Sequence, residues 1–143
     1  MNRELIHDQI VAVAERFGSG NTQEFKLLAK QLAACDSVEV VDGLLLVFSR
    51  SNAGESNYQK QQLAGRLLAK LKPKAPVDLQ AALEAVLPAY NPSIEELPFF
   101  LADRCGGEAV LQALRRLETG GEDPRHQAAA KTMRWWLKGS NVE

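Results

Sequence analysis

Seven short turn-forming segments, placed at regular intervals, divide this sequence into eight pieces of helical length. The breaks are rich in glycine, proline, serine and asparagine, as at 18–20, 72–76 and 91–93. The pieces between the breaks are 11–18 residues long, a length typical of helices and too long for most strands. The spacing therefore predicts an all-α protein with about eight helices.

Apolar residues recur within these pieces at the spacing of one helix face. In the first piece, about 2–17, Ile6, Ile10 and Val13 follow one another at intervals of four and three residues. In the last piece, about 124–138, Asp123 provides a cap and Pro124 a first helical residue. These patterns predict amphipathic helices that bury one stripe each.

The piece at 38–48 admits two interpretations. An aspartate, a serine and a glutamate at 36, 37 and 39 resemble a capping box, and the following residues are apolar almost throughout, as in a buried helix. The pair Asp42-Gly43 between apolar residues also fits the turn of a β-hairpin. Because an isolated hairpin is marginally stable and no other strand candidate exists to join it, we favour the helix.

Short connections make consecutive helices antiparallel neighbours. Over one domain at 1–143, the helices then form four hairpins at about 2–35, 37–71, 76–104 and 107–138. This pitch of roughly 35 residues resembles the HEAT and armadillo class of helical-hairpin arrays. The resemblance rests on helix number and pitch, and it implies a short α-solenoid with a scaffolding or binding function. A compact helical bundle built from the same hairpins fits the spacing nearly as well.

Charge and cysteine content narrow the functional classes. The chain has 17 basic and 18 acidic residues, so its net charge of −1 cannot provide a field that attracts nucleic acid. No run of about 18 apolar residues is present, and the N-terminal residues do not form a signal peptide, so we expect no membrane association. Cys35 and Cys105 lack CxxC spacing and are expected to be free thiols of a cytoplasmic protein.

No motif in the sequence indicates chemistry. Neither His7 nor His126 has a companion at metal-ligand spacing, and the glycine pairs at 106–107 and 120–121 mark helix ends rather than phosphate loops. Cys105 falls at a helix C-terminus, where the dipole opposes thiolate formation. We therefore predict no catalytic residue, no metal site and no cofactor.

Two features remain as candidate binding residues. In the helix at about 56–71, Arg66 and Lys70 lie on one polar stripe, which is either a solvated face or a contact for an acidic protein or RNA. In the last helix, Trp136 shares a face with Met133 and Leu137 and is expected in the core. Trp135 points almost opposite, on a face with basic residues.

For Trp135 three explanations stay open. It packs under another hairpin, it is covered by a lysine stem, or it is an anchor for a partner. Its basic neighbours on the helix are Lys131, Arg134 and Lys138.

The sequence thus favours a non-catalytic protein-interaction module, such as an adaptor, a chaperone-like subunit or a neutralising partner. The expected binding residues are Trp135, Lys131, Arg134 and Lys138, with Arg66 and Lys70 as a second patch. Weak nucleic-acid binding through the same basic stripes is the alternative class, and an enzyme with an unrecognised site is the third.

Overall fold

The computed structural model describes residues 1–51, 55–120 and 123–139, and in this part of the chain it contains helices and no strands. The all-α prediction is confirmed. Within these described ranges, eight α-helices and one short 3-10 helix follow one another. They are α1 (Arg3–Phe17), α2 (Thr22–Ala33), α3 (Ser37–Ser49), α4 (Glu55–Leu71), α5 (Leu79–Val86), η1 (Leu87–Ala89), α6 (Glu96–Cys105), α7 (Gly107–Gly120) and α8 (Pro124–Gly139).

Side-chain caps fix where several helices begin. The oxygens of Asn2, Asn21, Asp36 and Asp78 each accept a hydrogen bond from a backbone N–H in the first turn of the following helix. Such a bond satisfies one of the four donors that every helix leaves free at its N-terminus. Asp36 thereby starts α3, which confirms the helical interpretation of 38–48 over the hairpin.

Helix α6 begins three residues after the break at 91–93. Asn91 Oδ1 accepts hydrogen bonds from both the backbone N–H and the hydroxyl of Ser93 and holds that residue in a turn. The helix instead begins at Glu96. Pro98 then falls in the first turn, where its missing N–H leaves no intrahelical hydrogen bond unmade.

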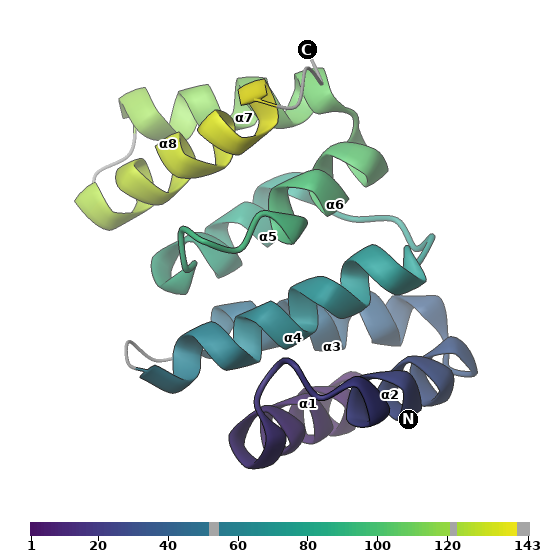
Figure 1. Cartoon of the computed structure of the whole chain (residues 1–143). Coiled ribbons are helices and arrows are strands. Elements are labelled where there is room, and N and C mark those ends of the chain that lie inside the picture. The colour runs from purple at the N-terminus through teal and green to yellow at the C-terminus, as the bar shows by residue number, and fades with distance from the viewer. Residues whose placement is uncertain (52–54, 121–122, 140–143) are drawn as a thin grey trace.

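The helices are stacked along one axis of the molecule (Figure 1). Helices α1 and α2 lie at one end, followed by α3 and α4, then α5 and α6, with α7 and α8 at the other end. The two helices of a predicted hairpin do not always pack on each other. Helix α7 packs extensively on its partner α8, whereas α1 packs on α3 much more than on its partner α2. Helix α5 also packs mainly on α3.

One continuous apolar core runs through the stack. It includes residues of every α-helix, and most of the largest fully buried side chains lie on α1 to α6. Gly43 allows the closest helix approach, since a Cβ atom there would lie 2.7 Å from Cγ2 of Ile6. This core makes α1 to α8 one scaffold, on which the outer faces of the end helices are left for solvent or for partners.

Candidate functional site

Helix α8 has one buried face and one outward face, as its sequence predicts. Met133 and Leu137 are fully buried, as is Ala130. On the opposite side, Lys131 and Trp135 are exposed, one helical turn apart. The helical phase read from the sequence is therefore right for these residues.

Trp135 is the most exposed of the large apolar side chains in the described part of the chain, at 65% of its surface. This exposure excludes the interpretation that it packs under another helix. Its ring makes an edge-to-face contact with the ring of Trp136, with the two centroids 4.8 Å apart and the planes at 67°. Edge-to-face packing is a favourable geometry for aromatic pairs, so Trp136 steadies an otherwise solvent-exposed side chain.

The prediction that Trp136 lies in the core is wrong. The side chain is half-buried at the edge of α8, where its Nε1–H donates a hydrogen bond to the carbonyl oxygen of Pro92 at 2.9 Å. Helix α8 packs against η1 and α6. Pro92 lies in the connection between these two elements. A tryptophan suits the boundary between two packed elements, because its ring is apolar while its N–H needs an acceptor.

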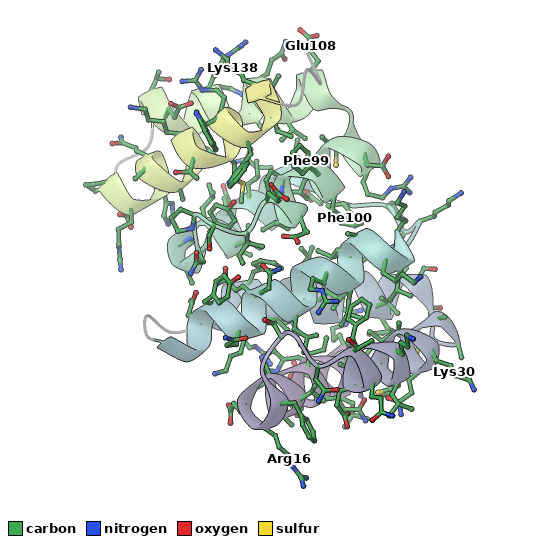
Figure 2. All side chains as sticks on the ribbon, viewed as in Figure 1. Arg16, Lys30, Phe99, Phe100, Glu108 and Lys138 are labelled. Carbon is green, nitrogen blue, oxygen red and sulfur yellow. The ribbon has the colours of Figure 1, made fainter. Side chains whose placement is uncertain are left out.

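Two lysines flank Trp135 on the same face of α8. Lys131 and Lys138 are exposed, and neither lies within 4.0 Å of a carboxylate in the part of the chain that the structure describes. Figure 2 shows Lys138 projecting from the end of the stack formed by α7 and α8, while Arg16 and Lys30 project from the opposite end. The outward face of α8, which we call the tryptophan face, thus consists of Lys131, Trp135 and Lys138.

Arg134 does not join the tryptophan face. Its Nε and Nη2 donate to the two carboxylate oxygens of Glu118 at 2.5 and 3.0 Å, a bidentate ion pair between α7 and α8. Both side chains are largely buried, with 25% and 15% of their surface exposed. Bidentate arginine–carboxylate pairs are strong and directional, so Arg134 serves to hold the last two helices together.

Arg66 and Lys70 lie elsewhere in the molecule. The guanidinium of Arg66 lies over the ring of Phe25, 4.2 Å from its centroid, and donates to the carbonyl oxygen of Ser19. This contact fastens the α1–α2 connection to α4, and only Lys70 of the pair is exposed. Helix α4 is separated from α8 by α5 and α6 (Figure 1), so the two predicted patches do not form one surface.

A buried polar contact, which the sequence analysis did not anticipate, fixes the η1 segment. The amide of Gln61 is fully buried, donates to the carbonyl oxygen of Ala89 at 2.8 Å and accepts from the backbone N–H of Asn91 at 2.8 Å. No sequence motif signals this role, because it depends on which loop α4 meets. The amide satisfies backbone groups that would otherwise be buried without partners, which is a structural function.

The ionisable groups of the described residues do not gather into a metal site. No three His, Cys, Asp or Glu side chains gather there at metal-ligand distance. His7, whose side chain is largely buried, contacts the exposed Asp8 at 2.9 Å. His126 lies 3.7 Å from Asp123 at the start of α8. Burial raises the pKa of the Cys105 thiol, which opposes formation of a reactive thiolate.

Comparison with protein-family models, with curated proteins and with solved structures finds no match to this chain. Among the described helices, none combines the length and the apolar character that crossing a membrane requires.

Proposed function

We propose that this chain is a non-catalytic protein-interaction module, and that its tryptophan face binds an acidic segment of another protein. The observation that carries the proposal is the 65% exposure of Trp135, whose ring is braced by Trp136. Tryptophan is among the residues most enriched at the energetic centres of protein interfaces. A side chain already held in place loses little rotamer freedom on binding.

The charge beside Trp135 supports an acidic partner. Lys131 and Lys138 have no carboxylate nearby among the described residues, so a partner's aspartates or glutamates would meet two unpaired ammonium groups. Rim charges of this kind chiefly increase the association rate and select against basic partners. An adaptor, a chaperone-like subunit or a neutralising partner would each use such a face.

We place this interaction in the cytoplasm. Cys35 and Cys105 are both free and half-buried, and their spacing matches no disulfide framework. The near-neutral net charge of −1 favours a protein partner over nucleic acid, since nucleic-acid affinity grows with the number of phosphate contacts.

The test is a quantitative capture from the cytosolic extract of the native host, followed by affinity measurement with the captured protein. Trp135→Ala should weaken binding of that protein by about 30-fold or more, the effect of losing an interface hot spot. Tyr58→Ala is the matched control, because Tyr58 is also an exposed aromatic, 40% accessible, but lies on α4. Equal binding by wild type and Trp135→Ala would refute the proposed face.

Charge reversal tests the acidic character of the partner. Lys131→Glu combined with Lys138→Glu should slow association and invert its dependence on salt. The control is Lys26→Glu with Lys30→Glu, two exposed lysines on α2 at the other end of the stack. If both double variants behave alike, the attraction is not local to the tryptophan face. Binding that disappears after nuclease treatment would assign the captured material to nucleic acid instead.

A further inference from the structure

The connection between η1 and α6, residues 90–95, is bonded to two helices at once. Figure 1 shows the layer of α5 and α6 between the layer of α3 and α4 and the layer of α7 and α8. Helix α4 reaches the connection from one neighbouring layer through Asn57 and Gln61, and α8 reaches it from the other through Trp136. The connection is therefore a physical link between α4 and the helix that carries the tryptophan face.

Asn57 and Gln61 are directed at one short stretch of backbone. They are two of the three buried polar residues in the described part of the chain, and they lie one turn apart on α4. Gln61 holds the carbonyl oxygen of Ala89 and the backbone N–H of Asn91, each at 2.8 Å. The contacts of Asn57, at 3.4 Å, go to the same carbonyl oxygen and to the side-chain amide of Asn91. A buried polar network whose members have partners fixes one arrangement of the backbone it binds.

Pro92 lies between two residues that are held in place. Gln61 holds Asn91, and Oδ1 of Asn91 accepts hydrogen bonds from the N–H and the hydroxyl of Ser93 at 3.0 and 2.6 Å. The ring of a proline also locks its own φ angle. The direction of the Pro92 carbonyl oxygen is therefore fixed from both sides, and this oxygen accepts the Nε1–H of Trp136 at 2.9 Å.

Trp136 passes this restraint on to Trp135. An indole has a single N–H, so the bond to Pro92 fixes the direction of the Trp136 ring at the edge of α8. Trp135 packs edge-to-face on that ring, a geometry that depends on the angle between the two planes. Among the described residues no other aromatic ring contacts Trp135. A displaced Trp136 would thus leave the exposed side chain without the ring that orients it.

We propose that Asn57 and Gln61 are positioning residues for the tryptophan face. They hold the connection on α4, the connection holds Trp136, and Trp136 keeps the ring of Trp135 in the orientation that a partner meets. The inference rests on the function proposed for this face. Both α4 side chains are buried, so neither is itself a contact for a partner. Their effect on binding passes through Trp135, because an ordered anchor loses less freedom on binding than a mobile one.

The first experiment needs no partner. On the ¹⁵N-labelled full chain it measures hydrogen exchange of the Trp136 indole N–H and the ¹⁵N–¹H nuclear Overhauser effect (NOE) of the Trp135 indole. Gln61→Met keeps the length of the side chain and removes both hydrogen bonds. We expect exchange at Trp136 to accelerate about tenfold or more and the NOE of Trp135 to fall. A Trp135 NOE equal to that of the wild type would overturn the proposal.

Gly43→Ala is the control for general destabilisation. It strains the packing of α3 on α1 and leaves the connection untouched, so the Trp135 NOE should keep its wild-type value. A decrease equal to that in Gln61→Met would mean that Trp135 follows overall stability, and the positioning role would be refuted.

Asn57→Ala decides the question if Gln61→Met does not fold. It removes only the two contacts at 3.4 Å, so exchange and NOE should change in the same direction by a smaller amount. An unchanged Trp135 NOE would then refute the proposal.

The second experiment uses the protein captured through the tryptophan face. The α4 variant should weaken its binding about fivefold or more, and should have no effect on binding when Trp135 is already replaced by alanine. A purely structural role would weaken binding alike in both backgrounds. The two proposals fail separately. Equal binding by wild type and Trp135→Ala would refute the face itself, whereas a weakened Trp135→Ala beside an unaffected α4 variant would refute only the positioning role.

Discussion

Replacing Gly43 by alanine should destabilise the protein, although alanine is the better helix former. Gly43 lies in the middle of α3 and faces α1. A Cβ atom at this position would lie 2.7 Å from Cγ2 and 2.8 Å from Cβ of Ile6, and 3.1 Å from the carbonyl oxygen of Arg3. Ile6 is fully buried, so its atoms cannot swing into solvent, and the Arg3 oxygen belongs to the backbone of α1. The two helices must therefore move apart.

The size of the effect follows from two opposing contributions. Overpacking a filled core costs about 1–3 kcal/mol, and the rigid atoms around Gly43 place this variant in the upper part of that range. Alanine recovers about 1 kcal/mol through its higher helix propensity. The net loss is about 1–2 kcal/mol, which corresponds to a decrease of about 3–7 °C in melting temperature for a chain of 143 residues.

Urea unfolding of Gly43→Ala, followed by circular dichroism, measures this loss. Gly120→Ala is the control, because no atom lies within 4 Å of a Cβ built at Gly120, and its stability should be equal to or above that of the wild type. A double-mutant cycle with Ile6→Ala, which removes Cγ2, should show that the two losses sum to at least about 1 kcal/mol more than the loss in the double variant. A stabilised Gly43→Ala, or strict additivity, would refute the reasoning.

Four further variants test the contacts around the two predicted patches and at the N-terminus. Arg66→Ala should cost about 1–2 kcal/mol, since it removes the contact with Phe25 and a hydrogen bond, whereas Lys70→Ala should change the unfolding free energy by less than about 0.5 kcal/mol. Trp136→Phe should lose about 1 kcal/mol in urea unfolding, because the Pro92 carbonyl oxygen loses its donor. Hydrogen bonding to Arg3 lowers the pKa of Glu39, so the pair's contribution to stability is present at neutral pH and is lost as the pH falls below about 4.5 and through that lowered pKa. Glu39→Gln should therefore reduce the dependence of the melting temperature on pH in this acidic range, and an unchanged dependence would contradict the pairing.

The helix at 38–48 shows how far local sequence determines the fold here. Asp36 at the cap and the apolar residues after it correctly predict α3. The glycine that made a hairpin plausible has a different role, because Gly43 lets Ile6 approach from α1. That role depends on a residue 37 positions away, and it could not be recognised until the two helices were placed together.

For the candidate binding residues, too, the sequence predicts some features correctly and misses others. Helical spacing correctly separates the exposed face with Trp135 from the buried face with Met133. Spacing gives only a direction around the helix, however, and long side chains reach past it. Arg134 reaches Glu118, Arg66 reaches the ring of Phe25, and Trp136 reaches the Pro92 carbonyl oxygen. Each of these partners lies on another element of the fold. Helical spacing alone could not reveal them, so it placed two of these residues in binding patches and the third in the core.

The end helices of a stack lack a neighbour on one side. Both ends of this molecule therefore expose apolar side chains, but these differ in character. At the α1–α2 end, Leu5 and Leu27 are 52% and 54% exposed. Single exposed aliphatic residues are normal on protein surfaces and require no partner. Trp135 differs because it is larger, contacts a second ring and lies between two lysines that make no ion pair with any described residue. Leu5→Ser and Leu27→Ser should therefore leave partner binding unchanged. Trp135→Ser should weaken it at least as much as Trp135→Ala, with little loss of folding stability. A partner lost through the leucine variants and retained by Trp135→Ser would move the binding surface to the opposite end of the stack.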